Sequence, residues 1–542
     1  MELKGSTALV LGGGGLVGMA VARRLLALRP ARLIVTALTR AEAEEASREL
    51  AAEAVGSPVE PAWGNIFLPA DLAEERLATL LAHPETRRRL VDDTLRPASP
   101  EAFRGNLLFG WLLKYQPDVV VDCINTATSL AYQDVFTSSS RLLRAVEDGA
   151  VSVEAVERHL LTQPTPQLIR HLEIAFEGMR QARTRAYVKI GTSGTGGMGL
   201  NIPYTHSEER PSRTLMTKSA VAGAHTLLLF LLGRTPGAPA IIEIKPTAAI
   251  AWREIGYGVI KRGGRTLDLV DCETPIPLAD AFTQDAQGWS YTGEPLQSVF
   301  INVGENGLFA RDEFETVSAL GQMELVTPEE IADVVILELC GRPTGRDIIG
   351  ALDAATFGPT YRGGYLRAVA VQELKALEDA RGVRSIAFET LGPPRLTKLL
   401  YESHILSRLR DSVRSLAASD ADVISEEAER LLRDRDHGLR RQILTVGLPI
   451  LLRDGESILR GETVVVLPDA RGVETAHRGW VDLRPSNIAQ WIRRAESIAS
   501  APAEKGTGSG ARWTAIEPDL PIEPARMAVW VFQEEGGYRI KR

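Results

Sequence analysis

The fold is decided by the stretch Ala8-Leu9-Val10-Leu11-Gly12-Gly13-Gly14-Gly15-Leu16-Val17-Gly18. An apolar run rich in β-forming residues passes into four glycines and then into a helix with one apolar face. This context is the one that a dinucleotide fingerprint requires, and the glycines fit it as Gly12-x-x-Gly15-x-x-Gly18 or as Gly13-x-Gly15-x-x-Gly18. The turn lets a pyrophosphate approach the helix N-terminus, where free N–H groups and the positive dipole end attract an anion. The alternative is a glycine-rich turn in another kind of α/β domain.

The second strand, expected at residues 32–38, bears on the choice of cofactor because of the residues that follow it. It leads into Thr39-Arg40, and no carboxylate appears before Glu42. An acidic residue here would hold the ribose 2′-hydroxyl, whereas an arginine would accept a 2′-phosphate. We therefore expect NADP as the cofactor, with NAD as the alternative. The competing interpretation is that Arg40 merely flanks the helix expected at 41–55.

Strands and helices alternate up to about residue 250, which predicts a doubly wound parallel sheet of the Rossmann type. The further strands are expected at 61–67, within 117–128, at 186–191 and at 240–245. With about six or seven strands, this α/β domain would cover residues 1–250. A smaller substrate-covering part would follow at 251–345, and a mainly helical region of unknown role at 346–542.

Shorter patterns in the later part of the chain predict individual elements. Thr327-Pro328-Glu329-Glu330 has the hydroxyl cap, the proline and the third-position glutamate of a helix start. The β-branched run Thr463–Leu467 and the run Met527–Phe532 predict strands.

Composition excludes several classes of protein. A net charge of −8 argues against a general nucleic-acid binder. The longest apolar run, Leu227–Leu232, is too short to span a bilayer, and no signal segment opens the chain, so we expect a cytoplasmic protein without membrane contact. The three cysteines lie far apart and the eight histidines include no close pair, so neither a disulfide framework nor a metal site is expected.

Several further motifs follow the glycine turn along the chain. They are Gly64-Asn65-Ile66, Pro117-Asp118-Val119-Val120-Val121 with Asn125-Thr126-Ala127, Thr192-Ser193, Lys218 before a small-residue helix, and Lys245-Pro246. With these motifs, residues 7–250, and more weakly those up to about 345, resemble the short-chain dehydrogenase/reductase superfamily. The most similar subgroup is the extended or atypical one, which includes sugar-nucleotide epimerases and dehydratases.

The resemblance implies a role for each matching residue. Lys218 would bind the nicotinamide ribose and Ser193 would position the substrate oxygen. Together with the residues after the second strand, the expected cofactor contacts are Gly12, Gly13, Gly15, Leu16, Val17, Gly18, Thr39, Arg40, Asn65, Ile66, Asn125, Thr126, Ala127, Lys218 and Pro246.

The sequence departs from the family at the residue four positions before Lys218, where the family has its catalytic tyrosine and this chain has Thr214. A phenol near pKa 10 can be brought towards neutrality by a neighbouring ammonium, whereas an aliphatic hydroxyl is too weak an acid for that role. Ser193, Thr214 and Lys218 could still bind a carbonyl or hydroxyl group. The proton would then come from another group, and Tyr204, His206 and Glu208 are the candidates in the adjoining loop.

These observations predict an NAD(P)-dependent enzyme that acts on a hydroxyl or carbonyl group of a polar small molecule, such as a sugar nucleotide. The alternative is a non-catalytic cofactor-binding sensor or scaffold that acts through its C-terminal helices. Those helices could instead mediate homo-oligomerisation of a working enzyme.

Overall fold

The structure, a computed structural model, describes most of the chain. Leaving aside the single positions 55, 98 and 132, the described residues are 1–191, 213–246, 249–262, 265–283, 288–303, 307–319, 326–342, 344, 354–357, 360–388, 394–500 and 516–535. They divide into two compact units, which are described separately. The first unit lies within 1–199, 212–251 and 325–363, and the second within 252–324 and 364–542.

The first unit is built on a seven-stranded sheet in the order β15-β6-β5-β4-β1-β2-β3. All neighbouring strands are parallel. The strands are β1 (Thr7–Leu11), β2 (Arg32–Ala37), β3 (Val59–Trp63), β4 (Val119–Asp122), β5 (Ala186–Ile190), β6 (Ala240–Pro246) and β15 (Ala354–Phe357). The strand order reverses between β1 and β4, so the topological switch point of a doubly wound fold lies beside the glycine turn. The predicted Rossmann-type sheet is confirmed.

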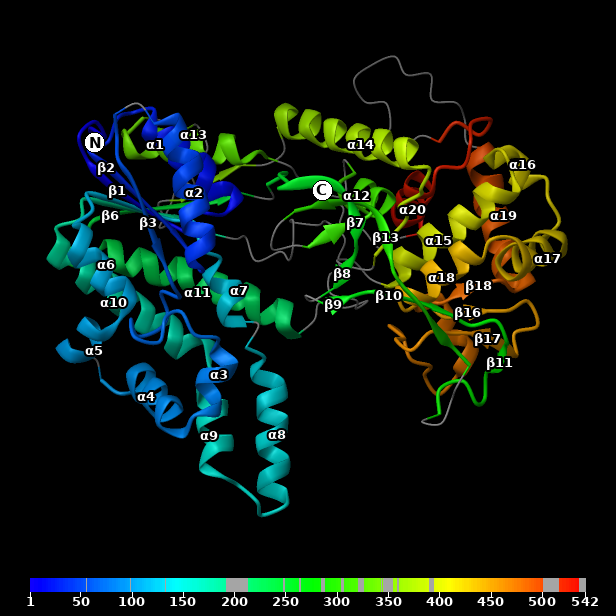
Figure 1. Ribbon diagram of the computed structural model, residues 1–542, viewed down its shortest axis with the longest axis horizontal. Helices are drawn as coiled ribbons and strands as arrows, with labels where there is room; N and C mark the ends of the chain where they lie inside the picture. The colour runs from blue at the N-terminus through cyan, green and yellow to red at the C-terminus, as the bar shows by residue number, and fades with distance from the viewer. Residues whose placement is uncertain are drawn as a thin grey trace. The chain divides into compact units, whose positions relative to one another are not determined.

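Helices cover both faces of this sheet (Figure 1). On one face lie α1 (Leu16–Leu26), α2 (Arg40–Glu53) and α13 (Pro328–Leu339); on the other lie α6 (Leu107–Tyr115), α10 (Pro164–Ala182) and α11 (Arg213–Gly233). Strand residues alternate between the two cores, so Val121 and Val188 pack towards α1 and α13, whereas Val120 and Tyr187 pack towards α10 and α11. The remaining helices of the unit are α3 (Leu77–Ala82), α4 (Pro84–Leu95), α5 (Pro100–Gly105), α7 (Thr126–Ala131), α8 (Val135–Glu147) and α9 (Val153–Leu160).

The sheet domain extends further along the chain than the boundary expected at residue 250. Strand β15 pairs with β6 from Ala354↔Glu243 to Phe357↔Pro246. Helix α13 packs its buried face on α1 and begins with the predicted capping box, in which Thr327 and Glu330 exchange hydrogen bonds. Both elements come from segments that the sequence placed in later domains.

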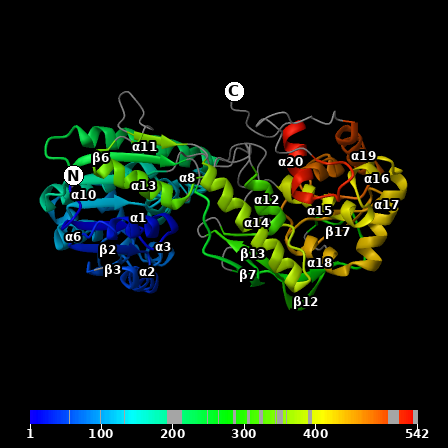
Figure 2. The same ribbon diagram turned by 90° about the horizontal axis from the view of Figure 1, so that it is seen from above.

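The second unit combines short strands, which pair antiparallel except for β16 with β18, with helices. Its strands are β7 (Glu254–Val259), β8 (Lys261–Arg262), β9 (Arg265–Thr266), β10 (Asp268–Asp271), β11 (Ile276–Pro277), β12 (Ser290–Pro295), β13 (Gln297–Asn302), β14 (Leu308–Phe309), β16 (Ile450–Leu451), β17 (Ser457–Leu459) and β18 (Val481–Asp482). Its helices are α12 (Arg311–Val317), α14 (Tyr361–Arg381, whose first residues fall in the first unit), α15 (Pro394–Leu409), α16 (Val413–Ala417), α17 (Ala421–Arg430), the π-helix η3 (Leu431–Arg435), α18 (His437–Thr445), the 3₁₀-helix η4 (Gly472–Arg478), α19 (Pro485–Ser500) and α20 (Pro524–Glu534). The helices α15, α16, α17, α19 and α20 gather within this unit (Figure 2).

Three expectations for this half of the chain change. Strand β11 pairs with β17, so a segment before residue 345 and one after it share a sheet. Residues Thr463–Leu467 form no strand, because the chain bends at Val465 and Val466, where the Val465 N–H donates to the Gly447 carbonyl oxygen at 2.9 Å. Met527–Phe532 lies in helix α20 and not in a strand. Five of its six side chains are buried, so the helix is surrounded by protein on nearly all sides here.

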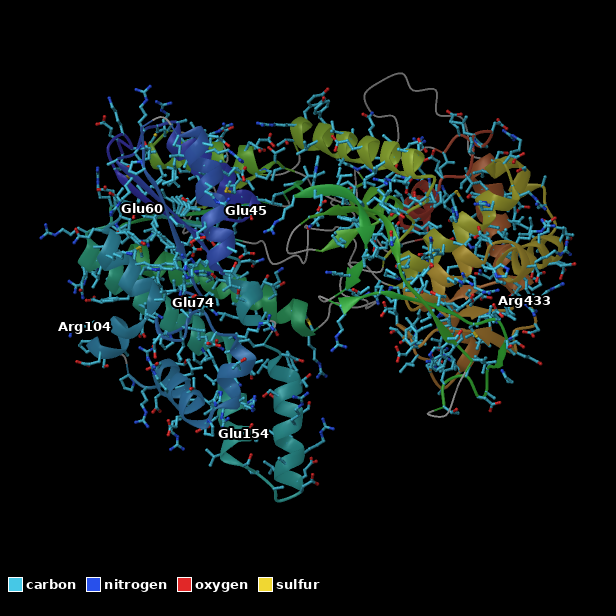
Figure 3. All side chains as sticks on the ribbon, viewed as in Figure 1. Glu45, Glu60, Glu74, Arg104, Glu154 and Arg433 are labelled. Atoms are coloured by element: carbon cyan, nitrogen blue, oxygen red, sulfur yellow. The ribbon has the colours of Figure 1, made fainter. Side chains whose placement is uncertain are left out.

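Helix α11 contains the window Met216–Gly233, which is long and apolar enough to cross a membrane by length and composition. Within the first unit, however, its residues Val221, Ala222 and Leu229 belong to the core against the sheet. One face of the helix therefore packs on the sheet, while Leu227 and Leu231 are exposed among the described residues. Charged side chains, by contrast, cover the surface of each unit, among them Glu45 on α2, Glu154 on α9 and Arg433 in η3 (Figure 3).

Candidate functional site

Three glycines of the first turn are required by backbone geometry and packing. Gly12 has a φ of +69°, and its N–H donates to Thr36 Oγ1 at 3.1 Å. A Cβ on Gly13 would lie 2.5 Å from Val35 Cγ1. A Cβ on Gly18 would lie 2.3 Å from the carbonyl oxygen of Gly12, so α1 can approach the turn only without a side chain there.

Gly15 has a different environment. It is the N-cap of α1 in an extended conformation, and the nearest atom to an added Cβ is the Gly12 oxygen at 3.3 Å. In the described part of the chain no side chain caps α1, and its first turn contains no acidic residue. The amides of Leu16, Val17 and Gly18 therefore form the positive end of a helix beside the switch point, which is the arrangement that binds a pyrophosphate.

The residues after β2 serve as the start of α2. The Thr39 hydroxyl is engaged in a capping box with Glu42. Arg40 is largely exposed, its Nε lies 2.7 Å from Glu44 Oε1, and its guanidinium lies 5.1 Å from the centre of the Trp63 ring. The guanidinium therefore lies where β2 and β3 end, which is the position that a contact with a 2′-phosphate requires. The ion pair with Glu44 is equally consistent with the competing interpretation, in which Arg40 only flanks the helix.

The two residues after β3 are engaged within the protein. Asn65 accepts a hydrogen bond from the Phe67 N–H at 3.0 Å through its side chain. Ile66 is 3% exposed and packs in the core on the α10 face of the sheet. The Ile66 side chain is therefore part of the core and is not exposed at the surface of the unit.

The turn after β4 adjoins the glycine turn, since a Cβ on Gly12 would lie 3.1 Å from Ile124 Cγ1. Asn125 accepts from the Thr128 N–H at 3.2 Å, and Thr126 and Ala127 are buried at the start of α7. The structure thus brings together two of the predicted cofactor-binding segments at the carboxyl ends of β1 and β4.

A buried polar group beneath this turn was not predicted from the sequence. Asp122 ends β4 and is paired in register with Lys189 of β5. Lys189 Nζ and the Tyr187 hydroxyl both donate to Asp122 Oδ2 at 2.8 Å. Burial acts to raise the pKa of Asp122, but the charge and hydrogen bond of Lys189, together with the hydrogen bond from the Ile124 N–H, lower it by more, so that the pKa lies below its ordinary value. The signal that could have revealed the group is a charged residue at the end of each of two buried strands.

Two other titratable side chains lie on the same side of the sheet. His171 of α10 and His225 of α11 are buried, and burial lowers their pKa values to about 4 and about 2. Lys218, also buried, lies seven residues before His225 on the buried side of α11.

The remaining predicted site residues are described incompletely or not at all. Pro246 ends β6, where it pairs with Phe357. Thr214 lies in the first turn of α11, and only its backbone is described. Ser193, Tyr204, His206 and Glu208 lie outside the described residues, so the expected catalytic set stays a prediction.

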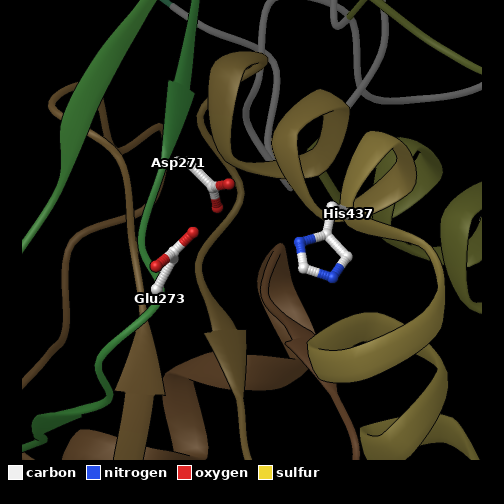
Figure 4. Close-up of side chains that lie close together, drawn as sticks. All are labelled: Asp271, Glu273 and His437. Atoms are coloured by element: carbon white, nitrogen blue, oxygen red, sulfur yellow. The ribbon is translucent and has the colours of Figure 1, made fainter.

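In the second unit Asp271, Glu273 and His437 offer ligand atoms within 4.8 Å of one another (Figure 4). Asp271 is already engaged, because Arg440 donates to both of its oxygens at 2.7 and 3.0 Å and Arg441 donates to one at 2.7 Å. Two guanidinium groups oppose a cation at this point, so the cluster is an arginine clamp on the end of β10.

Similar chains occur among solved structures of short-chain dehydrogenases/reductases. One from Mycobacterium ulcerans is 16% identical over 46% of this chain and 70% of its own, with a TM-score of 0.26. One from Serratia marcescens is 14% identical over 66% and 98%, with a TM-score of 0.29. One from Sphingobium yanoikuyae, in complex with NADPH, is 13% identical over 69% and 96%, with a TM-score of 0.29.

No curated protein matches the chain. A family model does match its C-terminal half, the beta-methylindole-3-pyruvate reductase C-terminal domain, over residues 269–536. The match includes most of the second unit, from β10 to α20. In this half, the chain is therefore similar to the C-terminal domain of beta-methylindole-3-pyruvate reductases.

Proposed function

We propose that the protein is an NADP-dependent reductase that converts a carbonyl group of a small organic acid into a hydroxyl group. The observation that carries the proposal is the uncapped N-terminus of α1 at Gly15, beside the switch point of a doubly wound sheet. The match of residues 269–536 to a reductase domain supports the same reaction class.

The family's name guides the choice of substrate. Beta-methylindole-3-pyruvate is a 2-oxo acid with an aromatic group, and a molecule of this class is the first candidate in place of a sugar nucleotide. When bound, NADPH supplies a hydride for the carbonyl carbon. The first-turn amides of α1 would hold the pyrophosphate, Arg40 the 2′-phosphate and Lys218 the nicotinamide ribose. Ser193 and Thr214 are the proposed hydrogen-bond donors to the substrate oxygen, and Tyr204 is the proposed source of the proton.

The cofactor site is tested by fluorescence titration with NADPH and with NADH. Gly15→Asp is the decisive variant, because aspartate is a favoured N-cap and the added Cβ meets no atom nearer than 3.3 Å, so the unit should fold. Its carboxylate would stand where the pyrophosphate binds, and we expect NADPH affinity to fall by about a hundredfold or more. Gly110→Asp on α6 adds the same charge in open space and is the matched control.

Each outcome has a definite meaning. Loss of binding in Gly15→Asp alone supports the site, and consumption of NADPH with indole-3-pyruvate then tests the substrate class. Equal NADPH affinity of the Gly15→Asp and Gly110→Asp variants would mean that the cofactor does not bind at the glycine turn. Binding of neither cofactor by the native protein would favour the sensor or scaffold function. Cytoplasmic location and homo-oligomerisation also stay predictions.

A further inference from the structure

The buried ion pair at the ends of β4 and β5 points to a positioning role. We propose that Lys189 and Asp122 act as a latch that holds the turn at residues 123–126 in the shape needed for cofactor binding, without touching the cofactor. The proposal rests on the proposed function of the glycine turn, and it assigns a role to two residues outside the expected contact set.

The latch bonds both sides of the turn. Lys189 Nζ donates to Asp122 Oδ2 at 2.8 Å, to the Ile124 carbonyl oxygen at 2.7 Å and to Thr126 Oγ1 at 3.1 Å. These three bonds use all three donors of an ammonium group. Asp122 completes the arrangement, because its Oδ1 accepts from the Ile124 N–H at 2.9 Å. Both backbone groups of Ile124 are therefore fixed by one ion pair.

A third side chain fixes the carboxylate. Tyr187 donates to Asp122 Oδ2 at 2.8 Å, and burial together with this carboxylate raises the pKa of Tyr187 well above its ordinary value, so the phenol keeps its proton. Asp122 is fully buried and Lys189 is 2% exposed. The pair is therefore shielded from bulk solvent, and its hydrogen-bond partners are groups of the protein.

The location of the pair explains why a charged latch occurs here. Apolar side chains of similar volume fill a core as well as a buried ion pair does, so stability alone is weak grounds for such a pair. A directional set of hydrogen bonds does fix the shape of a turn. This turn lies against Gly12, and a change in its shape would alter the surface between the ends of β1 and β4.

The decisive variant is the double substitution Lys189→Met/Asp122→Asn, which removes both charges and leaves no unpaired ion. The matched control is Arg87→Met/Glu157→Gln, which removes a buried pair between α4 and α9, with Nε–Oε2 at 2.9 Å, in the same unit. Neither Arg87 nor Glu157 contacts a predicted cofactor residue among the described interactions.

Two measurements are made on the full chain. Without cofactor, amide exchange at residues 123–127 should rise about tenfold or more in the latch variant, while amides of β1 keep their protection. The Kd for NADPH should then rise about tenfold, as for the loss of one or two hydrogen bonds, while the control stays within about twofold. The single variant Tyr187→Phe, which loses the hydrogen bond to Asp122 Oδ2 and lies outside the expected contact set, should show smaller changes in the same direction and serves if the double variant does not fold.

Three results would overturn the latch. Unchanged exchange at 123–127 would mean that the pair does not hold the turn. Raised exchange with an unchanged Kd would mean that the turn does not support the cofactor. An equal rise in Kd in the control would assign the effect to general destabilisation. If the native protein binds no cofactor, the proposed function fails and the positioning role falls with it, while the exchange measurement still decides whether the pair holds the turn.

Discussion

Mild acid should destabilise the first unit through two buried histidines. His171 lies between α10 and the sheet, with its ring centre 4.8 Å from that of Phe67. His225 lies on α11, and its Nε2 has no hydrogen-bond partner among the described residues. Burial lowers the pKa of His171 to about 4, and burial together with Lys189 lowers that of His225 to about 2. Both rings are therefore neutral in the folded unit.

The sign and size of the effect follow from proton linkage. Below pH about 6.5 each histidine takes up a proton in the unfolded chain but not in the folded unit. Stability is thus complete well above pH 6.5 and is lost as the pH falls. At about 1.36 kcal/mol per pH unit for each histidine below the pKa of about 6.5 that it has in the unfolded chain, the free energy of unfolding falls by about 4 kcal/mol between about pH 8 and pH 5. For a large domain this lowers Tm by roughly 8–16 °C.

The second unit should respond less, which provides an internal comparison. Burial lowers the pKa of His404 to about 3, so this residue lowers the free energy of unfolding of the second unit by about 2 kcal/mol at pH 5. Burial also raises the pKa of Asp312 to about 6, despite the arginines beside it. The folded unit then binds a proton at pH 5 that the unfolded chain does not, and this proton raises the free energy of unfolding by about 1.4 kcal/mol. The net loss is about 1 kcal/mol.

Hydrogen exchange with mass spectrometry in increasing denaturant reads the two units separately. Peptides from β4 and β5 report the first unit, and peptides from α15 and α19 report the second. We expect the first unit alone to lose several kcal/mol at pH 5, and the variant His171→Leu/His225→Leu to lose much less. An equal loss in both units, or an unchanged loss in the variant, would refute the assignment to these histidines.

Three further predictions follow from single contacts. Gly18→Ala should destabilise the first unit by about 1–3 kcal/mol or more in urea unfolding, because its Cβ would lie 2.3 Å from a backbone oxygen; a smaller effect would contradict the tight packing of α1. Arg40→Gln should weaken NADPH binding by about tenfold or more in the fluorescence titration and leave NADH binding nearly unchanged, and an equal loss for both would exclude a 2′-phosphate contact. Asp271→Asn should lower the thermal stability of the second unit by about 3 kcal/mol, because it deprives the buried Arg440 of its carboxylate, whereas added Zn²⁺ should leave the native Tm unchanged.

The part of the fold that depends on local signals was predictable from the sequence. The glycine turn, the alternation of strands and helices and the capping box at Thr327 each occupy a few adjacent residues. The run Met527–Phe532 shows the limit, because a short apolar segment does not distinguish a strand from a buried helix. The proline at position 524, at the first turn of α20, was the available clue.

The candidate site was predictable only where family motifs cover it. Lys189 and Asp122 lie 67 positions apart, and their pairing depends on the register of β4 with β5, which no local pattern specifies. The edge strand β15 has the same limitation, since Ala354–Phe357 is short and follows β6 after more than a hundred residues.

The late arrival of β15 and α13 has a consequence for synthesis and for fragment expression. When residues 1–250 have left the ribosome, strand β6 still lacks a neighbour at one edge and α1 lacks the cover of Ile331 and Val335. The nascent chain therefore carries an open sheet edge and an apolar patch until about residue 357 has emerged, which is a situation that favours aggregation. A fragment that ends near residue 250, where the sequence would place the boundary, keeps both defects permanently; a sound dinucleotide-binding fragment has to retain residues 326–357.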